Sequence, residues 1–72
     1  MRLRIEFERE EDGRWIASIS DLPGVNVYGA TREDAMASVQ ALALSVIADE
    51  IENGERDART LLTVSFAADA AA

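Results

Sequence analysis

Cysteine and histidine are both absent from the 72 residues of this sequence. Without cysteine there are no disulfide bonds and no thiolate chemistry. Without histidine the chain lacks the side chain that most readily moves protons at neutral pH, and a metal site built from nitrogen or sulfur ligands is also excluded. We therefore expect no enzymatic activity, no cofactor and no bound metal.

Long apolar runs and positive charge are scarce too. No apolar stretch reaches the ~18 residues that a membrane span needs, and Arg2-Leu3-Arg4 does not lead into the apolar core of a signal peptide. We expect a soluble, cytoplasmic protein with no membrane partner. Lys and Arg together number 7 against 14 for Asp and Glu, so the net charge is −7. This balance disfavours direct contact with nucleic acid and favours a basic partner.

The sequence does contain enough apolar residues for one small folded domain. Its hydrophobic fraction is 49%, which predicts a packed core and not a disordered chain. A domain of this length buries only about 60% of the surface of its unfolded chain, so its stability is marginal and association with another chain commonly stabilises it. We expect a single domain over residues 1–66, a flexible C-terminal tail over residues 67–72, and a homo-oligomer, either a dimer or a tetramer.

Alternating apolar and polar residues predict four strands. The predicted strands cover residues 2–9, 14–20, 25–28 and 61–66. The first two form a hairpin around an Asp-Gly turn. Trp15 is expected to close the core against a helix, whereas Tyr28 is expected on the open, half-apolar face of the sheet.

A tight turn and a glycine break surround the third predicted strand. Pro23 fixes its own φ and Gly24 accepts a positive φ, so residues 22–25 predict a β-turn. Gly29 ends the strand. We expect Gly24 and Gly29 to have backbone conformations that a β-carbon would strain.

A long helix is predicted from residue 32 to about residue 53. Thr31 can cap its first turn by accepting a backbone N–H, and Asp34 can reach back to the cap. Gly54 suits a left-handed cap at the other end. The stripe expected to face the core has members three and four residues apart: Ala35, Met36, Val39, Leu42, Ala43, Val46 and Ile47.

A second apolar stripe runs along the same helix. Its members are Ala37, Ala41, Leu44 and Ala48. Because one sheet covers only a third to a half of a helix, this stripe is left without a partner inside the domain. Helix propensity alone accounts for the alanines but not for Leu44. We therefore predict that the second stripe contacts another subunit or a partner.

The order β-β-β-α-β restricts the topology. Two antiparallel hairpins place the second strand between the first and the third, and a right-handed crossover brings the fourth strand parallel to the first. The sequence thus predicts an α+β fold with a mixed four-stranded sheet in the order 3-2-1-4 and one long helix on one face.

The sequence resembles the HicB-like antitoxins over roughly residues 3–66. The residues that carry the resemblance are Asp21-Leu22-Pro23-Gly24, Gly29-Ala30-Thr31-Arg32-Glu33-Asp34-Ala35 and, in the preceding hairpin, Asp12-Gly13-Arg14-Trp15. The chain departs from the family pattern at Ser20, where proline is common, and at Val25, where cysteine is common. It also stops where many relatives continue into a DNA-binding segment.

This resemblance implies a partly degenerate RNase H-like fold and a role in a type II toxin–antitoxin system. Family members neutralise HicA, a small basic RNA-cleaving toxin, so the implied mechanism is occlusion of the toxin's catalytic histidine and RNA-binding surface. RNase H catalysis needs several carboxylates around two metal ions, and here only Glu6 and Asp21 are candidates. A standalone oligomeric binding or structural module without a toxin is the alternative, and a weak hydrolase comes last.

Acidic residues gather at the predicted tip of the first hairpin. They are Glu8, Glu10, Glu11 and Asp12. Charge runs of this kind are usually solvated surface, but at a loop tip they are candidates for steering a basic toxin. Trp15 and Tyr28 are the candidate apolar anchors beside them.

Overall fold

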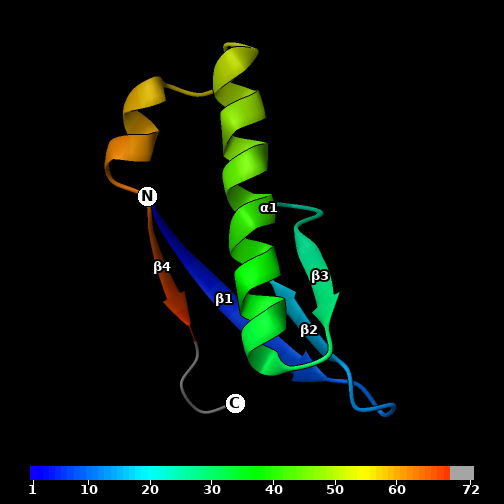
Figure 1. The fold of residues 1–72 in the computed structure, drawn as a ribbon. Coiled ribbons are helices and arrows are strands. Elements are labelled where there is room, and N and C mark those ends of the chain that lie inside the picture. The colour runs from blue at the N-terminus through cyan, green and yellow to red at the C-terminus, as the bar shows by residue number, and fades with distance from the viewer. Residues whose placement is uncertain (69–72) are drawn as a thin grey trace.

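The computed structural model describes residues 1–68 (Figure 1). Its elements in chain order are β1 (Arg2–Arg9), β2 (Trp15–Ser18), β3 (Asn26–Gly29), α1 (Arg32–Glu52), the 3₁₀ helix η1 (Ala58–Leu62) and β4 (Ser65–Ala68). The sheet has the order β3-β2-β1-β4. Both hairpin pairings are antiparallel, and β4 is parallel to β1. The predicted α+β topology is therefore confirmed.

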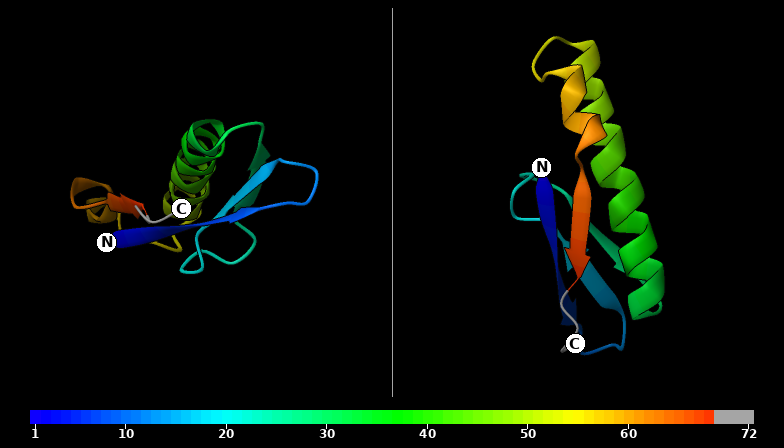
Figure 2. Two further views of the ribbon diagram at one scale, coloured as in Figure 1. Left: turned by 90° about the horizontal axis from the view of Figure 1, so that it is seen from below. Right: turned by 90° about the vertical axis from the view of Figure 1, so that its left-hand side faces the viewer.

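Helix α1 lies on one face of the sheet, as both views of Figure 2 show. It packs chiefly on β3 and β2 and much less on β1. The guanidinium group of Arg32, the first residue of the helix, lies 4.0 Å from the ring centroid of Phe7 and so joins the helix start to β1. The β2–β3 side of the sheet thus carries most of the helix.

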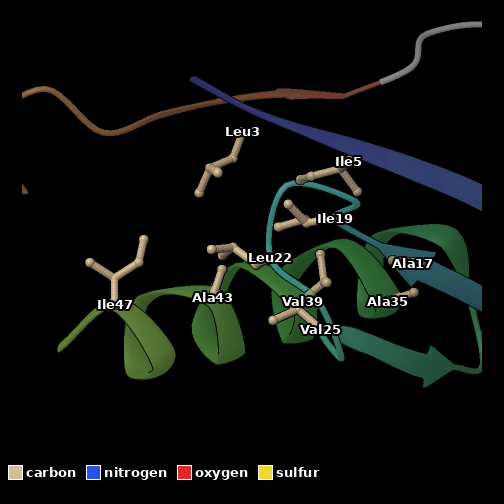
Figure 3. Close-up of a cluster of buried hydrophobic side chains, with 10 residues drawn as sticks. All are labelled: Leu3, Ile5, Ala17, Ile19, Leu22, Val25, Ala35, Val39, Ala43 and Ile47. Atoms are coloured by element: carbon tan, nitrogen blue, oxygen red, sulfur yellow. The ribbon is translucent and has the colours of Figure 1, made fainter. Parts of the chain in front are cut away.

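The core consists of ten buried apolar side chains that lie between the sheet and α1 (Figure 3). They are Leu3, Ile5, Ala17, Ile19, Leu22, Val25, Ala35, Val39, Ala43 and Ile47. The predicted core stripe of the helix is confirmed, because its four deepest members are buried and Met36, Leu42 and Val46 pack against them. Each fully buried Leu, Ile or Val contributes about 1.5–3 kcal/mol relative to an exposed side chain.

The turn before β3 forms as predicted. The Val25 N–H donates to the Leu22 carbonyl at 3.1 Å, which closes a β-turn over residues 22–25. Gly24 has φ +82°, a conformation that a side chain would strain. Leu22 and Val25, on either side of the turn, are both buried in the core. The turn therefore holds β3 against the helix.

Gly29 is needed for a different reason from the one predicted. It is not among the glycines with positive φ, so the expectation of a strained conformation is wrong at this position. A β-carbon there would instead collide with the backbone of Ala35, 2.8 Å from its Cα. Gly29 therefore permits the close approach of β3 to the first turn of α1.

Both ends of α1 carry the predicted caps. Thr31 Oγ1 accepts the Asp34 N–H at 3.0 Å, so the helix begins at Arg32 as expected. At the other end Gly54 has φ +74° and donates its N–H to the Ile51 carbonyl. The Glu55 N–H donates to the Glu50 carbonyl at 2.8 Å. These two bonds complete a Schellman motif.

The last strand lies further along the chain than predicted. Residues 61 and 62 belong to η1, and β4 covers Ser65–Ala68. The reason is local: the Asp57 carboxylate accepts the Arg59 N–H at 2.8 Å and caps η1. Pairing with the start of the chain begins only where the Ser65 N–H donates to the Met1 carbonyl at 2.9 Å. The predicted tail is thus wrong for residues 67 and 68, and residues 69–72 lie outside the described part.

Candidate functional site

The loop between β1 and β2 forms a tight projecting turn (Figure 1). The Glu10 N–H donates to the Arg14 carbonyl at 2.7 Å, and the Gly13 N–H donates to the Glu10 carbonyl at 3.0 Å. Gly13 takes φ +93°. The turn gathers Glu10, Glu11, Asp12 and Arg14 around an open depression. We call the surface formed by Glu8, residues 10–14 and Tyr28 the hairpin-tip surface.

Asp12 has a basic partner within this surface. Its carboxylate accepts the Arg14 backbone N–H at 3.0 Å and the Arg14 Nε–H at 2.7 Å. These contacts, the backbone one first, lower the pKa of Asp12 from its ordinary value. Because Arg14 offsets the Asp12 charge, the negative potential of the tip comes mainly from Glu8, Glu10 and Glu11.

Tyr28 joins the hairpin-tip surface through the register of the sheet. Tyr28 pairs with Ile16 on β2, and Ile16 pairs with Glu8 on β1, so the three side chains form one row across the open face. The Tyr28 hydroxyl donates weakly to Glu10 Oε1 at 3.5 Å. The Arg14 guanidinium lies 4.5 Å from the ring centroid. Tyr28 nevertheless keeps 52% of its surface exposed, as predicted.

Trp15 does not lie with Tyr28. It is partly buried and packs against the core, as expected for a residue on the face of β2 opposite to that of Ile16. The Arg9 guanidinium lies 5.9 Å from its ring centroid. Tyr28 is on the open face, so the two predicted anchors lie on opposite sides of the sheet. The structure therefore leaves Tyr28 as the aromatic side chain of the hairpin-tip surface.

Arg14 is the residue of this surface that sequence reasoning missed. Its position two residues after Asp12, across an Asp-Gly turn, was a signal for a local ion pair. The strand register was a second signal, because Trp15 pairs with Gly29 and so brings Arg14 near Tyr28. A hairpin register worked out from the sequence would have placed Arg14 on the tyrosine ring.

The second helix stripe is uncovered, as predicted. Ala37, Ala41 and Leu44 are exposed and Ala48 is partly buried, with 43% of the Leu44 surface accessible. Its role as a subunit contact stays a prediction. The structural motif residues serve the fold, since they form the turn before β3 and the cap of α1.

No group of three or more acidic side chains within residues 1–68 is arranged to hold a metal ion. In the same part of the chain, no helix has the length and apolar character needed to cross a membrane. No family model matches the chain, and no curated protein or solved structure matches it either.

Proposed function

We propose that this protein is a cytoplasmic HicB-like antitoxin that binds a small basic RNA-cleaving toxin of the HicA-like class and blocks it by occlusion. In this proposal the protein acts by binding a protein partner, without catalysis and without touching nucleic acid. The sheet order β3-β2-β1-β4 with one long helix is the fold that the resemblance implies. The motif residues of the turn and the helix cap have the structural roles that such a fold requires.

The hairpin-tip surface is the observation that carries the proposal. Glu10 and Glu11 lie on the projecting turn and Glu8 lies beside it near the end of β1. All three are absent from the ion pairs found among residues 1–68. A basic toxin approaching this turn gains Coulomb energy that ranges, per close charge pair, from about 1 kcal/mol in water to about 4 kcal/mol at a protein surface. In the complex their carboxylates bind the basic side chains of the toxin that otherwise bind RNA phosphates. Electrostatic attraction of this kind acts mainly on the association rate.

Tyr28 supplies apolar surface that is buried when the partner binds. Its exposed ring stands beside Ile16 on the open face and next to the acidic turn. Aromatic side chains in such positions commonly dominate the persistence of a complex. We therefore assign steering to the glutamates and persistence to Tyr28.

The test asks whether a small basic protein is encoded next to this gene and uses that protein as the probe. A triple variant, Glu8→Gln, Glu10→Gln and Glu11→Gln, removes three negative charges from the tip. A matched control, Asp49→Asn, Glu52→Gln and Glu55→Gln, removes three exposed charges at the far end of α1. The tip variant should associate about tenfold more slowly at low salt, and the control much less so.

Co-expression provides the functional readout. Wild-type protein should rescue cells from the growth arrest that the toxin causes, and purified protein should inhibit its RNA cleavage. If no such gene exists, if its product is not bound, or if the arrest is not relieved, the antitoxin proposal fails. The standalone binding module then becomes the better account.

A further inference from the structure

Four large apolar side chains are exposed within the described residues: Tyr28, Leu44, Leu61 and Leu62. Tyr28 belongs to the hairpin-tip surface and Leu44 to the second helix stripe. Leu61 and Leu62 are 46% and 82% accessible and belong to neither surface. Both lie in η1, directly before β4. Two adjacent leucines left in water on so small a domain call for a partner.

The segment around these leucines carries no charge. From Thr60 to Ala68 the chain has neither an acidic nor a basic residue, although its net charge is −7. This segment forms the side of the sheet opposite β3 (Figure 1). We call residues 60–68 the neutral edge.

Within residues 1–68, β4 has backbone pairing groups on its outer side that meet no neighbouring strand. The Ser65 N–H points inward, to the Met1 carbonyl. Because successive residues of a strand direct their N–H and C=O groups to alternate sides, those of Phe66 and Ala68 point outward. Natural edge strands are usually protected by a charge, a proline or a bulge. The sequence Ser65-Phe66-Ala67-Ala68 contains no charged residue and no proline.

Charge favours the neutral edge over the second helix stripe as the surface that contacts a second copy of this chain. The second helix stripe is bordered by exposed Glu33 and Asp34 at one end and by exposed Asp49 and Glu52 at the other, with no basic residue in the last turn. Two copies packed on that stripe bring acidic groups together in either orientation. Two neutral edges meet without placing like charges in contact.

We propose that the neutral edge is the interface of a twofold dimer, in which β4 pairs antiparallel with β4 of a second copy. Leu61 and Leu62 of each copy lie at the two ends of the paired strands, and the two sheets become one continuous sheet. This assignment replaces the helix stripe as the surface for self-association and goes beyond the proposed toxin binding. Because the dimer forms on the outer side of β4, the β1–β2 turn and Tyr28 of β3 lie outside the interface, and the hairpin-tip surface stays open in the dimer.

Sedimentation of two matched variants tests the interface. Leu62→Glu and Leu44→Glu each replace one exposed leucine by one negative charge, on the neutral edge and on the helix stripe respectively. At tens of micromolar, wild type and Leu44→Glu should sediment as dimers and Leu62→Glu as a monomer, with its dimer dissociation constant raised at least about tenfold. Circular dichroism confirms that each variant is folded.

A third variant tests the strand pairing itself. Ala68→Pro removes an outward N–H while the inward ladder to β1 remains, and it should also give a monomer. A monomeric wild type, or a dimer lost in Leu44→Glu and kept in Leu62→Glu, overturns the proposal. Salt separates this proposal from the antitoxin one. Rising salt should strengthen the dimer by screening like charges, whereas it should slow association with the basic toxin.

Discussion

The hairpin tip, which joins the two central strands β1 and β2, and the neutral edge along β4 have opposite chemistry. The tip is charged, projects from the sheet and presents one exposed aromatic ring. The neutral edge has no charge over residues 60–68 and presents two leucines beside an unprotected strand. A strongly acidic chain repels its own copies through most of its surface. The comparison indicates that the charged region suits a basic partner and the uncharged region suits a second copy.

The two regions also differ in how they are attached to the core. Strand β3, which carries Tyr28, packs closely on α1, whereas β4 is held mainly by its pairing with β1. Tyr28 is therefore carried by a strand that packs on helix α1. Strand β4 on the neutral edge is therefore the strand that additional pairing with a partner would stabilise most.

The largest expected effect is on the free energy of unfolding, when the close packing of β3 on the start of α1 is disrupted. Gly29→Val places a β-carbon against the backbone of Ala35, which cannot yield without moving the helix start. We expect destabilisation by about 3 kcal/mol or more, measured by chemical denaturation. Gly24→Val, where the problem is only φ +82°, should destabilise less, by about 1–2 kcal/mol. Equal effects at the two glycines would show that close packing at Gly29 is not the stronger constraint.

A smaller effect concerns how readily the backbone hydrogen bonds of β4 and β2 open locally to solvent. In a sample diluted to favour the monomer, the inward amides of β4 should exchange with solvent faster than those of β2. In a concentrated sample the outward amides of Phe66 and Ala68 should become protected, because β4 then pairs with a second copy. Hydrogen exchange followed by NMR measures both. If dilution leaves β4 as protected as β2, the difference in attachment is not real.

The smallest effect is the response of the tip to acid. The folded pKa of Asp12 lies below its ordinary value of 3.8 because Arg14 donates to its carboxylate. A group with a depressed pKa stabilises the fold at pH above its unfolded value, and this contribution is lost as pH falls through the folded pKa. The carboxyl carbon shift of Asp12 should therefore titrate below pH 3.8. Arg14→Ala keeps the backbone N–H and removes the guanidinium, so the midpoint should rise only part of the way toward that value, and a full return to it would contradict the backbone contact as the first cause.

Much of the fold could be predicted because local and long-range signals agreed. Thr31 and Gly54 mark the ends of α1, the alternation in β1 gives its buried face, and the crossover rule places β4 beside β1. The start of β4 was not predictable from alternation, because Leu62, Val64 and Phe66 follow a strand pattern. The Asp57 cap that turns residues 58–62 into η1 depends on one carboxylate contact.

The candidate site was predicted in composition but not in arrangement. The acidic turn and the exposed Tyr28 follow from the sequence, since both depend on local alternation and turn chemistry. The pairing of Asp12 with Arg14 and the separation of Trp15 from Tyr28 depend on strand register and side-chain direction. Such features become visible only when the strands are placed side by side.

The rate at which a basic toxin of the proposed class associates with this protein tests the central claim most directly. Stopped-flow measurements on wild type, the triple tip variant and the matched triple control of α1 should be made at low and moderate salt. The account predicts that wild type and control associate quickly at low salt and slow as salt rises, whereas the tip variant is slow at both. Equal rates for tip variant and control would contradict the assignment of the hairpin tip as the toxin-binding surface.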